Sequence, residues 1–296
     1  MKPRVSILVA AYNAEGYIAQ AIESVLAQSF TGWELIVCDD GSVDATASIV
    51  NNYAKNDSRI RLVAQANAGG AVARNTAYAV SSGEFVVLLD ADDMILPDKL
   101  QIQTSILDRN SEVGVAYGDT WFCDPEGARV ELESQRYPNQ HREGDVFASL
   151  CCGNMFAVHS AMIRRSAIDA VGGIHHPTRV QIADWDFWVR IAEKFCFAYH
   201  HDPVADYRLH PLMSARQDDA RKQVLQRQFT LCRIENLSRF SALDRKEKAS
   251  VYFATGRFCA RWSESSDALR YYFRSYLYNP FYLKTFLATV ALLVRK

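Results

Sequence analysis

Polar side chains that can bind a metal or a nucleotide follow three apolar runs in the first hundred residues. Each run has the composition of a buried strand, and the residues that follow are Tyr12 and Asn13, Asp39 and Asp40, and Asp90, Asp92 and Asp93. Charge crowded at the end of a buried strand costs free energy unless a cation lies beside it. Mg²⁺ and Mn²⁺ favour carboxylate oxygens and bind substrate phosphates. The pattern therefore predicts a divalent metal at residues 90–92 that holds a diphosphate.

The elements that must position these residues alternate between strand and helix. Strand-like runs cover 4–11, 34–40, 59–65, 84–90 and 113–122, and helical apolar spacing covers 16–28, 42–54, 70–82 and 97–110. This alternation predicts a parallel, doubly wound α/β sheet, whose ligands bind outside the carboxyl ends of the strands. Ser42 is expected to cap the second helix. Capping the next helix is the alternative role for Asp93.

The composition is that of an ordinary globular chain. It has 296 residues, 49% hydrophobic and 23% charged, and its formal net charge of −1 gives no overall attraction to nucleic acid. The seven cysteines lack disulfide or metal-binding spacing, so we expect reduced thiols and a cytoplasmic location. No signal peptide is expected, because the first residues lead directly into a strand. The glycine-rich fingerprints of dinucleotide sites and P-loops are absent.

The last third of the chain differs from the rest. From about residue 216 to residue 296 the sequence is helical in pattern and rich in Arg, Tyr and Leu. The apolar part of residues 281–296 is only about 14 residues long and contains Lys284, whereas a bilayer span needs ~20. Aromatic, apolar and basic residues together are typical of interfacial helices. Peripheral membrane contact and simple packing on the protein both remain open for this region.

Seven segments resemble, in order, the successive motifs of family 2 glycosyltransferases. They are VSILVAAYNAEGYIAQAIESVLAQSF, ELIVCDDGSVDAT, NAGGAVARN, GEFVVLLDADDMILPDKL, AMIRRSAIDAVGG, DWDFWVRIA and DYRLHPLMS. The resemblance covers residue 4 to about 214 and implies a GT-A fold, which is a Rossmann-like, mostly parallel sheet with flanking helices. It also implies nucleotide-sugar donors and inversion at the anomeric centre. It implies a glycosyltransferase domain at 1–215, with the nucleotide-sugar half at about 1–120 and the acceptor half at about 121–215. A helical region, 216–296, follows.

The resemblance also implies how the nucleotide is bound. Asp40, with Asp39 beside it, would accept a hydrogen bond from the base, and Tyr12 would stack on or flank that base. A carboxylate acceptor favours the N3–H of uracil or thymine, with guanine as the alternative. The other positions that match nucleotide-binding motifs are Asn13, Arg74, Asn75, Asp90 and Ala91.

The metal ligands follow from the same resemblance. Residues 90–92 form the DxD motif, and Asp92, its last carboxylate, would bind Mn²⁺ or Mg²⁺. His210 matches a position from which some relatives bring a histidine towards the metal or the diphosphate. Arg208 could reach phosphate, and the alternative for both residues is an ordinary place in a loop.

An inverting transfer needs a carboxylate that takes the proton of the acceptor hydroxyl. The family usually writes this motif as Glu-Asp-x-Asp, whereas this chain has Ala183 in place of the Glu. Asp184 matches the base, and Asp186 is expected to be structural. The replaced Glu leaves the positioning of the acceptor in doubt, and Trp185, Phe187 and Trp188 are expected to pack.

The sequence therefore predicts a metal-dependent transferase that moves sugar from a UDP- or dTDP-linked donor to a glycan or lipid-linked acceptor in cell-surface polysaccharide synthesis. The first alternative is a nucleotidyltransferase, but the loop AYNAEGY lacks the basic, glycine-rich character that a triphosphate needs. A receiver-like phosphoacceptor module would not need the DWDFW segment. An inactive glycan-binding relative is favoured only by Ala183.

Overall fold

The computed structural model describes residues 2–174, 183–211, 213 and 219–294, which divide into two compact units. The sheet unit comprises Met1–Asp145, Met155–Pro177 and Lys194–His210. The helical unit comprises Val146–Asn154, Thr178–Glu193 and Pro211–Lys296. The boundary predicted between residues 215 and 216 lies outside the described residues, and the division of the chain at that point stays a prediction.

The sheet unit is built from strands with short connections. Its strands are β1 (Val5–Ala11), β2 (Trp33–Asp39), β3 (Ile60–Ala64), β4 (Phe85–Asp90), β5 (Met94–Ile95), β6 (Val113–Cys123), β7 (Arg129–Leu132), β8 (Ala161–Arg164) and β9 (Cys196–Arg208). Its helices are α1 (Ile18–Leu26), α2 (Thr46–Asn56), α3 (Gly70–Ala79), α4 (Lys99–Arg109), α5 (Glu133–Arg136), η1 (Val158–Ser160) and α7 (Arg165–Ala170).

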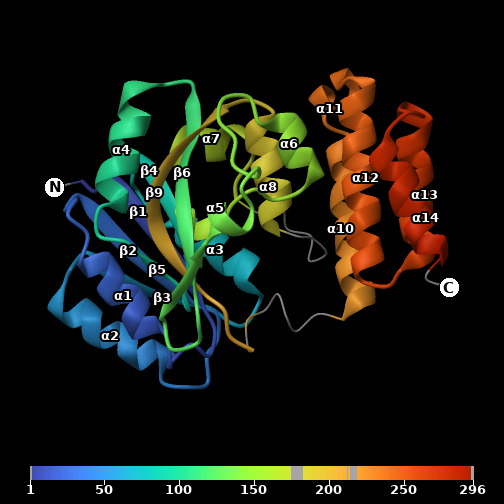
Figure 1. Cartoon of the computed structure of the whole chain (residues 1–296). Coiled ribbons are helices and arrows are strands. Elements are labelled where there is room, and N and C mark those ends of the chain that lie inside the picture. Colours follow the sequence, from blue (N-terminus) through green and yellow to red (C-terminus); the bar gives the residue numbers. More distant parts are fainter. Residues whose placement is uncertain (1, 175–182, 212, 214–218, 295–296) are drawn as a thin grey trace. The chain divides into compact units, whose positions relative to one another are not determined.

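The strands that the structure describes form one mixed sheet in the order β3-β2-β1-β4-β8-β6-β9-β5, with β7 paired to β6 (Figure 1). Strands β1 to β4 are parallel, and β6 is parallel to β9. Strand β8 is antiparallel to both β4 and β6 and separates them. The mostly parallel α/β sheet predicted from the sequence is confirmed. The minority strands β5, β7 and β8 run in the opposite direction to the others.

The parallel half has helices on both faces. Alternate residues of β1, namely Val5, Ile7 and Val9, share a buried apolar cluster with residues of α1 and α4. The opposite face is covered by α3, which contacts β1 and β2. Strands buried on both faces read as continuous apolar runs, which is why the sequence identifies them clearly.

The second helix begins four residues later than expected. Helix α2 starts at Thr46, and Ser42 does not cap it. The side-chain Oδ1 of Asp44 instead accepts the N–H of Thr46 at 2.9 Å. Ser42 is used elsewhere, because its Oγ accepts a backbone N–H from the loop after β1.

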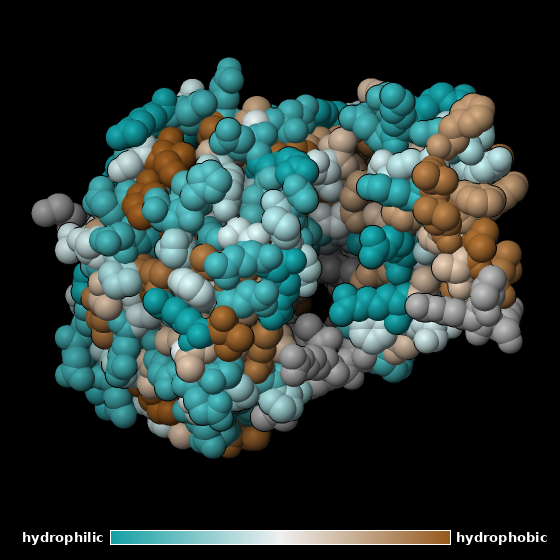
Figure 2. Space-filling view, viewed as in Figure 1, coloured by the Kyte–Doolittle hydropathy of each residue, from teal (hydrophilic) through white to brown (hydrophobic). Residues whose placement is uncertain are grey.

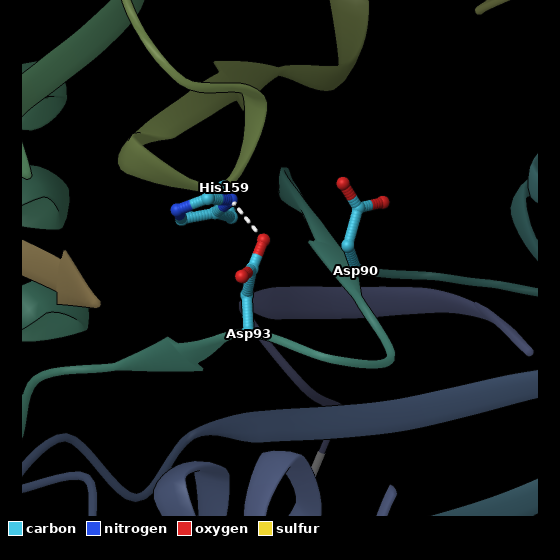
Figure 3. A group of neighbouring side chains, drawn as sticks. All are labelled: Asp90, Asp93 and His159. Carbon is cyan, nitrogen blue, oxygen red and sulfur yellow. Dashed lines mark ion pairs between the residues drawn. The ribbon is translucent and has the colours of Figure 1, made fainter. Parts of the chain in front are cut away.

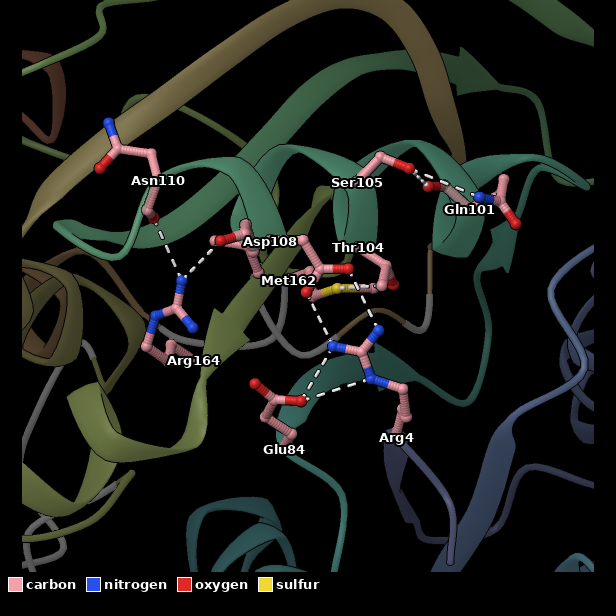
Figure 4. Close-up of polar contacts among 10 residues, drawn as sticks. Arg4, Glu84, Gln101, Thr104, Ser105, Asp108, Asn110, Met162 and Arg164 are labelled. Atoms are coloured by element: carbon pink, nitrogen blue, oxygen red, sulfur yellow. Dashed lines mark hydrogen bonds and ion pairs between the residues drawn. The ribbon is translucent and has the colours of Figure 1, made fainter. Parts of the chain in front are cut away.

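Arginines bind together the edge of the sheet at which β1 and β4 begin. Arg4 lies between Glu84 and Asp108, with nitrogen–oxygen distances of 2.9 and 2.7 Å, and so connects the start of β1 to β4 and α4 (Figure 4). Arg164 of β8 donates to the carbonyl oxygen of Leu107, near the end of α4, at 2.7 Å. Both ion pairs of Arg4 are partly exposed, so each contributes only about 0.2–1 kcal/mol.

The helical unit confirms the helical character predicted for the last third of the chain. Its helices are α6 (Phe147–Cys152), α8 (Ala183–Ala192), α10 (Ala220–Glu235), α11 (Ser238–Ala242), α12 (Arg245–Arg261), α13 (Ser265–Tyr278) and α14 (Leu283–Val294). A capping box of Asp244 and Glu247 opens α12. Within the described residues, no helix has both the length and the apolar character needed to cross a bilayer. All seven cysteines lie in the described part of the chain, and none forms a disulfide there.

Candidate functional site

Parallel pairing brings the carboxyl ends of β1, β2 and β4 to one edge of the sheet. Ala11 is in register with Asp39, and Ala10 with Asp90. The polar residues that follow these strands therefore lie on the same edge, as the sequence predicted. We call residues 12–13, 39–40 and 90–93 the strand-end rim.

Asn13 joins two loops of the strand-end rim. Its backbone is left-handed, with φ of 49°, a conformation that Asn adopts more readily than most residues. Its Oδ1 accepts the N–H of Val43 at 2.9 Å, and its own N–H donates to Oγ of Ser42 at 2.9 Å. Tyr12, next to this junction, is 54% exposed. An exposed aromatic ring beside an ordered loop is available to stack on a flat ligand.

Asp40 is buried and orders the loop that leads into α3. Its Oδ1 accepts from Nε2 of Gln65 at 2.6 Å and from the N–H of Ala68 at 2.9 Å, while its Oδ2 accepts from the N–H of Gly69 at 2.7 Å. The side chain is only 2% exposed. Binding a base through Asp40 would therefore require at least one of these bonds to be exchanged.

Asp39 has more acceptor capacity than its neighbour. Its Oδ2 accepts weakly from the N–H of Ser42 at 3.3 Å, and its Oδ1 is buried without a hydrogen-bond partner among the described residues. A buried carboxylate oxygen that lacks a partner costs free energy until a donor arrives. Of the two adjacent carboxylates, Asp39 is therefore the one that keeps a buried oxygen without a hydrogen-bond partner among the described residues.

Arg74 and Asp90 form an ion pair at the end of β4. Arg74 lies on α3, and its side chain is largely buried, whereas that of Asp90 is one-third exposed. Asn75 follows on the same helix and is half-buried. The pair places one positive charge beside the first carboxylate of the DxD motif, so a phosphate would have to share Arg74 with Asp90. Ala91, between the two carboxylates of the motif, is buried.

The structure brings together the two residues expected to meet the metal. Nε2 of His210 lies 2.9 Å from Oδ2 of Asp92. The imidazole is buried and packs on Tyr17, with ring centroids 4.8 Å apart. The Asp92 side chain remains 30% exposed. A carboxylate with an imidazole beside it fits Mn²⁺, which accepts both donor types, and Mg²⁺ could use the carboxylate alone.

Asp93 does not cap the following helix, so that interpretation is wrong. Oδ2 of Asp93 lies 2.9 Å from Nδ1 of His159, outside good hydrogen-bond alignment, and both residues are almost completely buried. Figure 3 shows the Asp93 carboxylate directed at this imidazole, while Asp90 projects from the end of β4. Burial raises the pKa of Asp93 to about 6, although His159 opposes the shift. Burial lowers the pKa of His159, but Asp93 more than offsets this, so the net shift is upward.

Arg208 is a structural clamp, which leaves little support for the possibility that it reaches phosphate. Its backbone N–H donates to Oδ1 of Asp93 at 2.8 Å. Its guanidinium donates to the carbonyl oxygens of Asp92 at 3.1 Å and Pro125 at 2.8 Å, and also to the Gln20 side chain. With its polar groups engaged in this way and its side chain buried, Arg208 holds the DxD segment against β9.

Donor atoms of Asp90, Asp93 and His159 lie within 4.8 Å of one another and offer a second possible ligand set for a cation. Asp93 in this set already accepts from Arg208, which makes the more exposed Asp92 the better ligand. The sequence reasoning missed His159. Its one signal is a histidine inside the apolar segment FAVHSAM, since a buried polar group needs a partner.

The sequence reasoning also missed a second buried group beside β6. Asp119, Glu133 and His141 have donor atoms within 4.8 Å of one another. Asp119 accepts the N–H of Ser134 at 3.1 Å, whereas Oε2 of Glu133 lacks a hydrogen-bond partner among the described residues. Burial raises the pKa of Glu133 to about 7. His141 stacks on Tyr199 at 4.6 Å, and burial lowers its pKa.

Asp184 lies in the helical unit, in the first turn of α8, and is partly buried. Its neighbour Asp186 is buried and lies 2.9 Å from Arg190 and 2.7 Å from Arg233, which fits the structural role expected for it. Trp185 donates to the carbonyl oxygen of Leu150 at 2.6 Å. The expected packing role of Trp185, Phe187 and Trp188 is confirmed, because all three are buried. The side chain of Ala183 lies outside the described part of the structure.

Comparison with known families identifies the chain's family. The model of the family described as Glycosyl transferase family 2 matches residues 6–172, more than half of the chain. The chain belongs to this family. The family predicted from the motifs is thereby confirmed.

Curated relatives of the chain are glycosyltransferases. A protein of Bacillus subtilis described as the putative teichuronic acid biosynthesis glycosyltransferase TuaG is 43% identical over 211 residues, which are 70% of this chain and 80% of that protein. The Escherichia coli UDP-Glc:alpha-D-GlcNAc-diphosphoundecaprenol beta-1,3-glucosyltransferase WfgD is 44% identical over 116 residues, 39% of this chain and 45% of that protein. An uncharacterized glycosyltransferase of Haemophilus influenzae is 36% identical over 167 residues, 56% of this chain and 64% of that protein. The match therefore spans less than two thirds of the length of the last two.

Solved structures share the fold at low sequence identity. The mannosyltransferase PcManGT of Pyrobaculum calidifontis, in complex with GDP-Man and Mn²⁺, aligns with a TM-score of 0.63 and 20% identity over 100% of this chain and 81% of that one. TarS 1-349 of Staphylococcus aureus, in complex with UDP-GlcNAc, aligns with a TM-score of 0.56 and 17% identity over 91% of this chain and 72% of that one. The GT-A fold predicted for the chain is confirmed.

Proposed function

We propose that this family 2 glycosyltransferase is metal-dependent and inverting, and that it moves a hexosyl or hexosaminyl group from a UDP- or dTDP-linked donor to the hydroxyl of a glycan or lipid-linked acceptor. The observation that carries the proposal is the strand-end rim, where Asp92 and His210 lie 2.9 Å apart beside the Arg74–Asp90 ion pair. Acidic groups suited to a metal and a cation suited to phosphate thus occur at the edge where α/β sheets bind ligands.

The nucleoside would bind at the ends of β1 and β2. Tyr12 offers an exposed ring, Asn13 fixes the loop that carries it, and Asp39 and Asp40 offer carboxylate oxygens to the base. Uracil and thymine present an N–H that such an oxygen accepts, whereas guanine remains the alternative. Asp39 has an oxygen without a hydrogen-bond partner among the described residues, and Asp40 could accept after releasing the loop at Ala68 and Gly69.

The diphosphate would bind at the end of β4. Arg74 and Asn75 from α3, together with Asp90 and Ala91, would form this part of the site. Asp92 and His210 would hold Mn²⁺ or Mg²⁺, and the PcManGT complex with Mn²⁺ supports this choice. The bound ion would offset the negative charge that develops on the leaving diphosphate.

Asp184 would act as the general base. The acceptor oxygen attacks the anomeric carbon as its proton passes to the Asp184 carboxylate, and the bond from that carbon to the diphosphate oxygen breaks on the opposite face. One bond forms as another breaks, so the configuration inverts. Asp186 cannot replace Asp184 easily, because Arg190 and Arg233 already engage both its oxygens.

The acceptor class rests on the relatives. WfgD is named for transfer to a diphosphoundecaprenol-linked sugar, and TuaG for teichuronic acid biosynthesis. These names support a role in surface polysaccharide synthesis and a glycan or lipid-linked acceptor. We also propose that the chain is cytoplasmic and acts at the cytoplasmic face of the membrane, which the scattered cysteines of the sequence support.

Calorimetry with UDP, dTDP and GDP, each with and without Mn²⁺, tests the donor site. We expect metal-dependent binding of UDP or dTDP and weaker binding of GDP. A clear preference for GDP would overturn the base assignment, and metal-independent binding would overturn the cation site. Incubation with UDP-sugars and acceptor lipids, with release of UDP as the readout, tests transfer. Tight donor binding without any release or transfer would favour an inactive glycan-binding relative.

A further inference from the structure

The helical unit carries an apolar surface on its last two helices. Half of the exposed large hydrophobic side chains of the described residues fall between Phe273 and Leu293. Figure 2 shows apolar residues gathered over α13 and α14. Monomeric proteins rarely leave large contiguous apolar patches exposed without an interaction partner. We call the exposed side chains Phe273, Leu277, Phe281, Phe286, Leu287 and Val290 the C-terminal apolar face.

Helix α14 exposes its apolar side, whereas a helix that packs on its own domain usually buries that side. Phe286, Leu287 and Val290 are 57%, 56% and 42% exposed and recur at helical spacing. Thr285, on the opposite side, is buried, and its Oγ1 lies 2.9 Å from Oγ of Ser275 on α13. The helix therefore attaches through small and polar groups and presents its apolar stripe outward.

The turn between the helices extends this surface. Phe281 is 94% exposed, so its ring has almost no contact with the rest of the chain. Leu277 and Phe273 of α13 are spaced by four residues and project from the same side of their helix. Exposed aromatic and aliphatic residues thus occur on α13, the turn and α14.

Charge indicates what covers this face. From residue 268 to residue 296 the sequence contains five basic residues and no acidic one, although the whole chain has a net charge of −1. Arg270 and Lys284 are exposed, whereas Arg274 pairs with Glu235 at 2.8 Å. A second copy of the chain would bring the same positive charges opposite one another, because a two-fold interface pairs identical surfaces. An anionic surface with an apolar interior matches both features.

We propose that the C-terminal apolar face docks on the surface of an anionic lipid bilayer, with α13 and α14 lying in the interface. Phe281, Phe286 and Leu287 enter the boundary between headgroups and acyl chains, while Arg270 and Lys284 remain with the acidic headgroups. Helix α14 has 12 residues, which is too short to span a bilayer and is compatible with an interfacial segment. The docking does not depend on transfer activity, and it holds whether or not the acceptor is a lipid.

Vesicle sedimentation of the full chain tests the proposal. Vesicles of phosphatidylcholine alone are compared with vesicles that contain phosphatidylglycerol, at low and high salt. We expect binding to the anionic vesicles, weakened by salt. The double variant Phe286→Ser/Leu287→Ser should lower the bound fraction at least tenfold, and Arg270→Glu/Lys284→Glu should lower it on anionic vesicles specifically. The matched control, Val43→Ser/Val130→Ser, removes two exposed apolar side chains of the sheet unit and should bind normally.

Each other outcome overturns the proposal. Absence of binding by the parent chain, or equal binding by the parent and the Phe286→Ser/Leu287→Ser variant, removes the docking role of this face. Equal binding to neutral and anionic vesicles removes the role of charge. Sedimentation equilibrium is run alongside, and a parent dimer that this variant converts to monomer, without vesicle binding, assigns the face to a second copy. Circular dichroism verifies that each variant is folded. UDP binding is measured separately, so that a change in vesicle binding can be distinguished from a change at the donor site.

Discussion

The strand-end rim and the C-terminal apolar face depart from the usual distribution of residues in opposite ways. The rim buries charged groups such as Asp40 and Asp93, the latter beside His159. The last helices expose Phe281, Phe286 and Leu287. Charged residues are seldom fully buried without partners, and large exposed apolar patches are uncommon. This difference indicates which kind of ligand each region binds. Buried charge at the end of a strand suits a small ionic ligand, whereas an apolar stripe that faces outward suits an extended apolar surface.

Of the substitutions considered for the two regions, replacement of Asp92 should have the largest effect on donor binding and transfer. Asp92→Ala removes the exposed carboxylate beside His210, so metal-dependent binding of the donor should fall to background and transfer with it. Calorimetry with UDP and Mn²⁺ measures the first, and UDP release the second. Asp98→Ala, six residues on and exposed, is the matched control and should behave as the parent. Normal activity in Asp92→Ala, or in the parent with excess chelator, would remove the metal from the mechanism.

Replacing Asp184 should separate chemistry from binding. Asp184→Asn keeps the shape of the side chain but cannot take a proton, so transfer should fall by about 10²–10⁴-fold while donor affinity stays nearly unchanged. Asp186→Asn is the control for a structural effect, because it weakens the contacts with Arg190 and Arg233 and should lower thermal stability instead. Joint loss of donor binding and transfer in Asp184→Asn would show that Asp184 is structural.

The effect of a buried carboxyl group on stability can be tested at Glu133, apart from any effect on catalysis. Burial and nearby Asp119 raise its pKa from 4.5 to about 7, against the opposing effect of His159. The unfolded chain therefore releases this proton at lower pH than the folded protein does. The free energy of unfolding should fall as pH rises from about 4.5 to 7, by at most about 3 kcal/mol, since each pKa unit is worth about 1.4 kcal/mol.

Glu133→Gln should flatten this dependence and raise stability at pH 8 relative to the parent. Urea unfolding at pH 5 and pH 8 measures both effects. Glu131→Gln, at a partly exposed position paired with Arg136, is the control and should leave the pH dependence intact. A parent whose stability rises between these pH values would contradict the assignment.

The smallest effect is expected from the apolar face. Leu287→Ser alters a side chain that is 56% exposed, so the free energy of unfolding should change by no more than about 0.5 kcal/mol. Leu231→Ser, at a buried position of α10, is the contrast and should cost several times as much. Thermal unfolding of the two variants compares them directly. A large loss in Leu287→Ser would show that this stripe packs against protein.

The parallel strands of the sheet could be predicted from the sequence more completely than the antiparallel ones. The apolar runs of β1 to β4 are continuous because both faces are buried, so the sequence shows them clearly. Strand β8 has four residues, and its place between β4 and β6 depends on partners distant in sequence, which no local pattern records. The start of α2 was misplaced because Ser42 pairs with the loop after β1 instead of with its own helix.

The candidate site shows the same division. Strand ends can be recognised from local sequence, and they led to Asp39, Asp40, Asp90 and Asp92. The partners of these residues come from far away: the contact between Asp93 and His159 and the clamp of Arg208 on Asp92 join segments that fold together only in three dimensions. A motif identifies the group that binds, whereas the residues that fix its orientation depend on the assembled sheet.

The position of β8 has a consequence for the chain as it leaves the ribosome. Strands β1 to β4 and β6 are synthesised before β8, which must enter between β4 and β6. Until residue 164 has emerged, β4 keeps one edge without a neighbour and β6 lacks both β8 and β9, and open edges pair readily with other chains. A nascent chain arrested after β6 should therefore be much more prone to aggregation than one arrested after β8.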